Sequence, residues 1–391
     1  MAYIRRQIDL TLAGALRRFP AVVVTGPRRV GKTTLLRSAV RGAQYVLLED
    51  PDVQDRIRSD PRGFIESLRP PVILDEIQNT PRLLNYIRTI IDAHPSRNGQ
   101  WLFTGSQEAP LMQGITESMA GRAAILQLLP FSLVETPRVN LLHGGFPEVV
   151  LRPGGRELWF ASYLQTYIER DVRGIAYVRD LPTFRRFLSL LASRHGQMLN
   201  RSDLAAPLGV SVPTVSEWIR ILEITGQIIV VPPYFENFGK RLIKSPKIYW
   251  CDTGLVCHLL GIRSQAELER SPFLGSIFEG EVAAEILKSQ INSGRRKELY
   301  YFRDQQGLEI DFVVPQPQAR FWLVEAKASR TVRPAMASSM MSLARLTGKR
   351  TMRSIVVHRK ARTGREFSGL ADNVEARTLE SFVAELNGKK S

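Results

Sequence analysis

The 391-residue sequence has few of the residues that define secreted or zinc-centred proteins. Its only two cysteines, Cys251 and Cys257, imply no disulfide framework, and a reducing cytoplasmic location fits this usage. The five histidines are scattered, without the spacing to a cysteine or another histidine that zinc sites use. No apolar run reaches about 18 residues, and the first residues lack a signal-peptide core. We therefore expect neither a membrane span nor secretion.

Acidic residues are also scarce relative to basic ones. The chain has 54 Lys and Arg against 38 Asp and Glu, a formal net charge of +16. This surplus favours a polyanionic partner, either nucleic acid or an anionic membrane surface, although general solubility is an alternative explanation. The apolar share of 44% is ordinary, and the length predicts about two to three domains.

One stretch organises the rest of the chain: AVVVTGPRRVGKTTLL at 21–36. The apolar run at 21–24 predicts a buried strand, and 34–40 predicts a helix. Between them stands a Gly-x-x-x-x-Gly-Lys-Thr pattern in the strand–loop–helix setting of a phosphate-binding loop. The residues predicted to bind the nucleotide here are Gly26, Pro27, Arg28, Arg29, Val30, Gly31, Lys32, Thr33 and Thr34.

Each residue type in this loop has a physical role. Glycines let the backbone fold around an anion, and the N–H groups at the helix start point inward. Lys32 supplies a point charge for the outer phosphates, and Thr33 offers a hydroxyl to Mg²⁺. The alternative, a glycine turn beside a surface lysine, does not explain the flanking strand and helix. ATP and Mg²⁺ are the expected cofactors.

A second acidic element supports the nucleotide site. An apolar strand beginning at Pro71 ends in Asp75 and Glu76. Asp75 can hold the Mg²⁺ that Thr33 also contacts, and Glu76 can polarise an attacking water. Two acids at a strand end can also be a surface turn, but their position downstream of a phosphate loop favours the nucleotide site.

Two further residues complete the predicted ATPase site. Either Thr104 or Ser106, at the end of the strand starting at Trp101, can sense the γ-phosphate, and we favour Ser106. Arg122 is a candidate arginine finger that acts across a subunit boundary, with a solvated arginine before a strand as the alternative. Strands that alternate with helices predict an α/β domain with a parallel sheet and ligands at the strand carboxyl ends.

The middle of the chain predicts a different architecture. Residues 131–191 are mostly helical in pattern, and 200–234 read as helix, turn, helix and strand, which is typical of a winged helix. The helix Val212 to Ile224 would enter a major groove. Non-specific DNA contact or a structural linker is favoured over sequence reading, because its expected outer face carries few cations. The outer face of this helix is expected to carry Thr214, Ser216, Glu217 and Arg220. The probable wing that follows carries cations that could touch phosphates: Lys240, Arg241, Lys244 and Lys247.

The last segment, from about residue 275, carries a second possible chemistry. One predicted strand places Asp311 among apolar neighbours, and the next places Glu325 and Lys327 on one face. Charges on apolar strands are costly unless they share a task. One Mg²⁺ between Asp311 and Glu325 would meet that cost, and Lys327 could then orient or activate a water. The alternative is a partly exposed sheet edge with solvated charges.

Motifs along nearly the whole chain resemble those of prokaryotic AAA-type ATPases that carry a winged helix and a nuclease-like C-terminal domain of unknown function. The matching stretches are GPRRVGKTT, VILDEIQ, FTGS, GRAAILQLLPFSLVE, GGFPEV, YIERDV, KSPKIYWCDTGL, FRDQQGLEIDFVV and VEAKAS. The resemblance implies an AAA module at 1–135, a helical and winged-helix domain at 136–265 and an α/β nuclease-like domain at 266–391. The last is similar to the PD-(D/E)xK superfamily.

This resemblance carries roles onto particular residues. Lys32, Thr33, Asp75, Glu76, Ser106 and Arg122 fall at the AAA motif positions. Glu279, Asp311, Glu325 and Lys327 fall at the helix acid, metal acid and E-x-K positions of the nuclease-like domain. The first functional hypothesis is an ATPase that processes DNA as a homo-oligomer, with a hexamer as one form and metal-dependent cleavage as an added activity. The alternatives are an ATP-switch regulator and a scaffold, both without nuclease activity.

Overall fold

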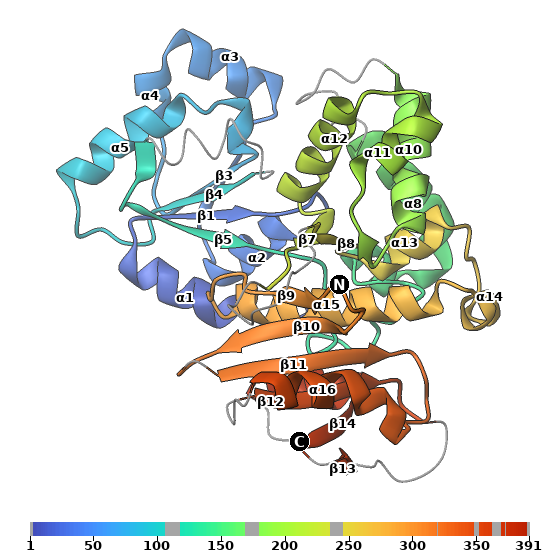
Figure 1. The fold of residues 1–391 in the computed structure, drawn as a ribbon. Helices are drawn as coiled ribbons and strands as arrows, with labels where there is room; N and C mark the ends of the chain where they lie inside the picture. The colour runs from blue at the N-terminus through green and yellow to red at the C-terminus, as the bar shows by residue number, and fades with distance from the viewer. Residues whose placement is uncertain are drawn as a thin grey trace. The chain divides into compact units, whose positions relative to one another are not determined.

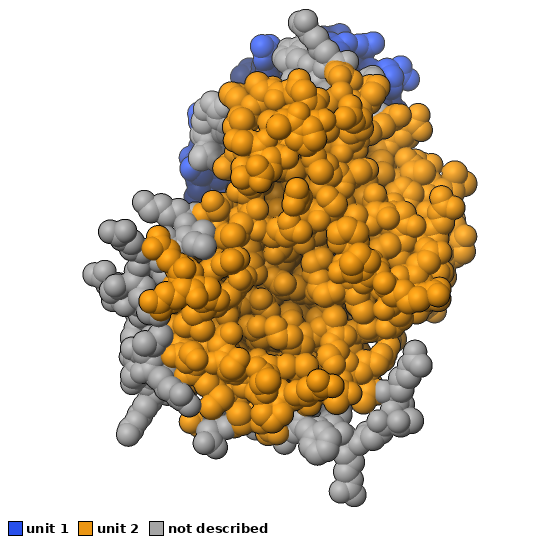
Figure 2. Space-filling view, turned by 45° about the vertical axis from the view of Figure 1, so that its right-hand side comes forward, with its two compact units in different colours: residues 1–131, 224–226, 291–295 blue, residues 132–223, 227–290, 296–391 orange. Residues whose placement is uncertain are grey.

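A computed structural model gives the fold of the chain (Figure 1). It describes residues 3–105, 118–168, 180–234, 245–318, 320–347, 352–361, 369–371 and 373–388. The chain divides into two compact units, coloured separately in Figure 2. Unit 1 comprises Met1–Phe131, Ile224–Gly226 and Ile291–Arg295, and unit 2 comprises Ser132–Glu223, Gln227–Gln290 and Arg296–Ser391.

Unit 1 is built on a five-stranded parallel sheet of order β2-β3-β4-β1-β5. Its strands are β1 (Ala21–Thr25), β2 (Gln44–Leu47), β3 (Val72–Asp75), β4 (Trp101–Thr104) and β5 (Ala123–Gln127). The central strand β1 is apolar at four of five positions and fully buried, as expected of a strand covered on both faces. The α/β class and parallel sheet predicted from the sequence are therefore confirmed.

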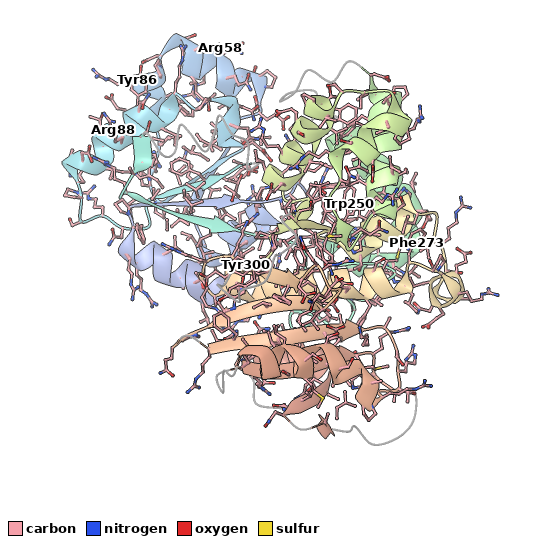
Figure 3. The ribbon with its side chains drawn as sticks, viewed as in Figure 1. Arg58, Tyr86, Arg88, Trp250, Phe273 and Tyr300 are labelled. Atoms are coloured by element: carbon pink, nitrogen blue, oxygen red, sulfur yellow. The ribbon has the colours of Figure 1, made fainter. Side chains whose placement is uncertain are left out.

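Helices cover the sheet of unit 1. They are α1 (Asp9–Arg18), α2 (Lys32–Ala39), α3 (Pro51–Ser59), α4 (Pro61–Glu66), the short 3₁₀ helix η1 (Ile77–Asn79) and α5 (Leu83–Ala93). The apolar stripe of α5, including Leu84 and Ile87, packs with Phe64 of α4 and Phe103 of β4 in one core. The polar side of α5 faces outward, where Tyr86 and Arg88 project (Figure 3).

The first part of unit 2 is helical and ends in a small antiparallel sheet of order β6-β8-β7. Phe184 and Phe187 of α10 pack against Trp218 of α12 and fix the two helices together. The elements are α7 (Pro147–Leu151), η2 (Pro153–Gly155), α8 (Arg156–Tyr163), η3 (Leu164–Ile168), α10 (Leu181–Ser193), β6 (Gln197–Met198), α11 (Arg201–Ala205), η4 (Ala206–Leu208), α12 (Val212–Ile224), β7 (Ile228–Val231) and β8 (Lys247–Trp250).

The second part of unit 2 holds a six-stranded mixed sheet of order β13-β14-β12-β11-β10-β9. Strands β9, β10 and β11 pair antiparallel, whereas β12 runs parallel to β11 and to β14. The elements are α13 (Thr253–Leu259), α14 (Gln265–Arg270), α15 (Leu274–Asn292), β9 (Tyr300–Arg303), β10 (Glu309–Gln316), β11 (Arg320–Lys327), η5 (Pro334–Ala337), α16 (Ser338–Thr347), β12 (Met352–His358), β13 (Gly369–Ala371), β14 (Val374–Thr378) and α17 (Leu379–Leu386).

The three-part division predicted at 135/136 and 265/266 stays a prediction, since the two units follow a different criterion, compactness of the fold. Within the described ranges, no helix combines the length and apolar character needed to cross a membrane.

Candidate functional site

The phosphate-binding loop links β1 to α2 in unit 1. Gly26 follows β1 with φ of 135°, and a Cβ there would lie 2.0 Å from the carbonyl oxygen of Leu128. Gly31 caps α2 with φ of 94°, also in the left-handed region. Glycine adopts these conformations without a steric penalty, so both glycines are required by the backbone path. The N–H groups of a first helical turn, such as that of α2, are the groups that bind anions at helix starts.

Arg6 braces this loop, a role that the sequence did not reveal. Its guanidinium donates hydrogen bonds to the carbonyl of Val30, at 3.0 Å, and to the carbonyl of Leu129, at 2.7 Å. The same group stacks over the ring of Phe131. Arg6 is buried, so these contacts form in a low-dielectric environment where hydrogen bonds are strong. Arg6 therefore connects the phosphate loop, at Val30, to the segment that follows β5, at Leu129.

Lys32, the first residue of α2, is buried against the loop that precedes it. Its ammonium donates hydrogen bonds to the carbonyls of Gly26 and Pro27, each at 3.0 Å. An ammonium held at this place by neutral carbonyls can exchange them for the stronger charge of a phosphate oxygen. The lysine predicted to contact the outer phosphates thus lies within the loop.

The magnesium residues predicted from the sequence lie together. The Thr33 hydroxyl is 3.0 Å from both carboxylate oxygens of Asp75. Asp75, buried at the end of β3, also accepts hydrogen bonds from Tyr45, at 2.7 Å, and from Thr104. Burial and this bond to Asp75 raise the pKa of Tyr45 to about 12, which keeps it a donor. Hydroxyl and carboxylate oxygens are suitable ligands for Mg²⁺, so Thr33 and Asp75 fit that ion.

Glu76 has an unusual backbone, with φ of 59° and ψ of 52°. A non-glycine residue in the left-handed region is strained, and such strain is common at active sites. Its N–H donates to Thr104 Oγ1 at 3.1 Å. Its carboxylate accepts a hydrogen bond from Gln78 and lies 3.8 Å from the guanidinium of Arg28. The predicted water-polarising acid is therefore tethered to the phosphate loop itself.

Arg122 lies at the amino ends of the strands, whereas the phosphate loop lies at their carboxyl ends. Its carbonyl accepts a hydrogen bond from Ala21, at the amino end of β1, whereas the phosphate loop leaves the carboxyl end, roughly 13 Å away for a strand of this length. Its guanidinium binds Asp92 through two bonds, of 2.5 and 3.0 Å. Arg122 therefore lies far from the phosphate loop of its own chain, and its role as a finger in another subunit stays a prediction. Ser106 lies outside the described residues.

A second constellation forms in unit 2, and we call it the acid cluster: Glu279, Glu309, Asp311 and Glu325, with the cations Lys247 and Lys327. Lys247 lies at its centre, with its ammonium 3.0 Å from Glu279, 2.7 Å from Glu309 and 3.7 Å from Asp311. The prediction that Lys247 belongs to a phosphate-contacting wing is wrong, because it begins the fully buried strand β8 and is only 4% exposed.

The other predicted residues of the cluster also meet. The Lys327 ammonium lies 2.6 Å from Glu325, as expected of residues two apart on one strand. Antiparallel pairing of β10 with β11 brings Asp311 beside Glu325, and Asp311 accepts a hydrogen bond from the N–H of Ala326 at 2.9 Å. Glu279 reaches the same place from α15 and accepts a bond of 2.5 Å from Tyr249.

Burial dominates the electrostatics of the acid cluster. It raises the pKa of Glu279 to about 7, and the nearby charge of Asp311 adds to this effect. The same two causes, in the same order, raise the pKa of Glu325 to about 7. Burial alone would lower the pKa of Lys247, but the charges of Glu279, Asp311 and Glu309 outweigh it and hold the pKa above its usual value.

This arrangement does not present a ready metal site. Across the residues that the structure describes, no group of three or more His, Cys, Asp or Glu side chains is arranged to hold a metal ion. The ammonium groups of Lys247 and Lys327 compensate the carboxylates instead, although Oε2 of Glu325 is buried without a hydrogen-bond partner. A Mg²⁺ between the two carboxylates of Asp311 and Glu325 stays a prediction.

The helix expected to enter a DNA groove is α12. Its cation Arg220 is bound to Glu217 one turn away, by hydrogen bonds of 2.5 and 2.9 Å. Thr214 and Ser216 also have partners within this segment. Polar groups that satisfy one another in this way offer little for reading base edges. The other predicted wing cations, Lys240, Arg241 and Lys244, lie outside the described residues.

Comparison with known proteins defines the class of this protein. Residues 18–136, which include the phosphate loop, Asp75 and Glu76, match the family described as AAA domain, and this match supports an ATPase of the AAA P-loop type. Residues 135–266 and 274–373 match two families described as domains of unknown function, DUF8612 and DUF4143.

The chain belongs to the same family as two mycobacterial proteins. Uncharacterized protein Mb2031c of Mycobacterium bovis and Uncharacterized protein Rv2008c of Mycobacterium tuberculosis are each 32% identical to it over 345 residues. The alignment covers 86% of this chain and 76% of each relative. Among solved structures, the Walker-type ATPase PABY2304 of Pyrococcus abyssi is similar at 16% identity, with a TM-score of 0.41, over 66% of this chain and 96% of that chain.

Proposed function

We propose that this protein binds and hydrolyses ATP with Mg²⁺ and couples that hydrolysis to action on DNA as a homo-oligomer. The contact that carries the proposal is the 3.0 Å approach of Thr33 to Asp75 beneath the phosphate loop. In this assignment Lys32 and the loop N–H groups bind the phosphates, and Thr33 and Asp75 hold Mg²⁺. Glu76 then orients the attacking water through its carboxylate.

The tether between Arg28 and Glu76 fits a site that is completed by its substrate. Arg28 belongs to the phosphate loop, so a bound triphosphate offers its guanidinium a stronger anion than Glu76. Release of Glu76 from Arg28 would leave its carboxylate free to accept a proton from water. The acid would then be available only when nucleotide is present.

Action on DNA rests on charge and architecture. The net charge of +16 favours a polyanion, and α10, α11, α12 and the sheet β6-β8-β7 have the helix and strand order expected of a winged helix. The paired side chains on α12 favour contact with the phosphate backbone over base reading.

A second function, an ATP-controlled regulator or scaffold without nuclease activity, is favoured by one observation. The carboxylates expected to hold a cleavage metal already face lysine ammonium groups, Asp311 at 3.7 Å from Lys247 and Glu325 at 2.6 Å from Lys327. Magnesium-dependent cleavage of plasmid or branched DNA by wild type, lost in Asp311→Ala, would favour the nuclease. No cutting by folded protein would favour the regulator.

The proposed ATPase is tested by turnover with and without DNA. We expect wild type to hydrolyse ATP and DNA to stimulate it, and Glu76→Gln to lose about a hundredfold or more in turnover, the usual contribution of general base catalysis. Arg88→Ala is the matched control, since Arg88 is exposed on α5 away from the loop (Figure 3). Equal turnover in Glu76→Gln and Arg88→Ala would refute the assignment. Indifference to DNA would favour the regulator.

A further inference from the structure

Lys247 is an unusual residue in unit 2. Its ammonium is enclosed by carboxylates from two separate elements, Glu279 of α15 and both Glu309 and Asp311 of β10, while Lys247 itself begins β8. A lysine that is 4% exposed is seldom found unless it is paired, and here three acids surround its ammonium, of which Glu309 also pairs with Arg303 at 3.1 Å. This segment of the small antiparallel sheet therefore supplies the central positive charge of the acid cluster.

The position of this charge bears on what else the cluster can bind. A divalent metal would need oxygens of Asp311 and its neighbours at about 2.0–2.6 Å. The Lys247 ammonium already lies within 3.0 Å of Glu279 and 3.7 Å of Asp311. Two cations held by the same carboxylates in a buried site repel each other strongly. Lys247 and a divalent metal would therefore compete for these carboxylates.

We propose that Lys247 is a built-in counter-cation that fills the acid cluster in place of a divalent metal, so that metal enters only when this side chain leaves. The folded chain is then a closed state of the cluster. In this state the negative charge of Glu279, Glu309 and Asp311 is compensated without metal. This inference concerns unit 2 alone and does not depend on the proposed ATPase.

A cavity adjoins Lys247 and could receive its side chain. It has a volume of about 340 Å³ and lies within unit 2, and its wall includes both Lys247 and Glu309. Its other polar lining residues include Arg194, Asn200 and Asp203. Lys247 lines this space and its stem is flexible, so rotamer changes offer the side chain a route away from Glu279 and Asp311. Opening the cluster thus needs no unfolding of β8.

The test measures Mn²⁺ binding by nucleotide-free protein. The concentration of free Mn²⁺ is read from its electron paramagnetic resonance signal. We expect wild type to take up no Mn²⁺ that depends on Asp311. Lys247→Met should bind one Mn²⁺ per chain, at least about tenfold more tightly than wild type, and Lys247→Met/Asp311→Asn should lose that site. Lys247→Arg keeps the charge and is the matched control, which should exclude the metal as wild type does.

Two results would overturn the proposal. One is Mn²⁺ uptake by wild type that Asp311→Asn abolishes. The other is a folded Lys247→Met protein that binds no more Mn²⁺ than wild type. Should Lys247→Met fail to fold, Lys247→Met/Glu279→Gln, which removes one charge of each sign, takes its place under the same criterion. A gain of thermal stability on adding Mn²⁺ to either variant, absent in wild type, is the expected second readout.

Discussion

Replacing Lys247 with methionine keeps most of the side chain's length and removes its charge from the acid cluster. In unit 2, Glu279, Glu309 and Asp311 would lose their shared cation. Removing one partner of a buried ion pair costs about 3–5 kcal/mol of unfolding free energy, since the other charge is left uncompensated. We expect a loss of this size at pH 8.

The loss should shrink in acid. Burial raises the pKa of Glu279 from 4.5 to about 7, so the stability that this group contributes is complete below pH 4.5 and is lost as the pH rises through 7. Without Lys247 the folded-state pKa of Glu279 rises further, and the penalty above pH 7 grows by about 1.4 kcal/mol per pKa unit. At pH 5 Glu279 is protonated in both proteins. The loss should then be about 1–2 kcal/mol, that of the missing hydrogen bonds.

The assay is urea unfolding at pH 5 and pH 8, followed by tryptophan fluorescence. Trp159, Trp218, Trp250 and Trp322 lie in unit 2, so the signal reports mainly on that unit. Arg152→Met is the control, because its pair with Glu148 is exposed and such pairs contribute about 0–1 kcal/mol. Equal losses for Lys247→Met at both pH values, or a loss at pH 8 no larger than that of the control, would refute this view of the cluster.

Two further predictions concern unit 1. Arg122→Ala and Glu76→Gln should each be inactive alone, and mixing them should restore some ATP turnover if Arg122 acts in a neighbouring subunit; no recovery at any mixing ratio counts against the finger. Gly26→Ala should abolish nucleotide binding and lower the melting temperature, since the new Cβ would lie 2.0 Å from the Leu128 carbonyl, whereas Gly14→Ala, with open space around its Cβ, should do neither. An unchanged Gly26→Ala protein would contradict the close approach of Gly26 to the Leu128 carbonyl.

Local patterns predicted much of the fold. The sequence predicted a helix at Val212–Ile224 and a strand that ends at Asp75 and Glu76. The structure has both elements, as α12 and β3. The spacing of apolar residues over 1–20 predicts a helix along that whole stretch, whereas α1 begins only at Asp9. Buried Ile8, Leu12 and Ala15 still form its inward stripe. Strong periodicity and a specific loop motif are the signals that survive without tertiary information.

The acid cluster could be predicted only in part. The spacing of Glu325 and Lys327 on one strand foretold their contact, and Glu309, two residues before Asp311, carried the same period-two signal. Lys247 gave no such signal, because a lysine at a strand end usually faces solvent. The partners of Lys247 are at least 32 residues away from it in the sequence. Only the packing of β8 with α15 and β10 therefore reveals that Lys247 is buried.

The central claim is that a triphosphate binds between the glycine loop and the Thr33–Asp75 pair. Its most direct test is Mg-ATP affinity, measured by calorimetry for wild type and Lys32→Ala. We predict saturable binding by wild type at one site per chain, weakened about ten- to a hundredfold in Lys32→Ala by loss of one charge-assisted contact. Equal affinity of the two proteins, or no binding by folded wild type, would contradict the claim.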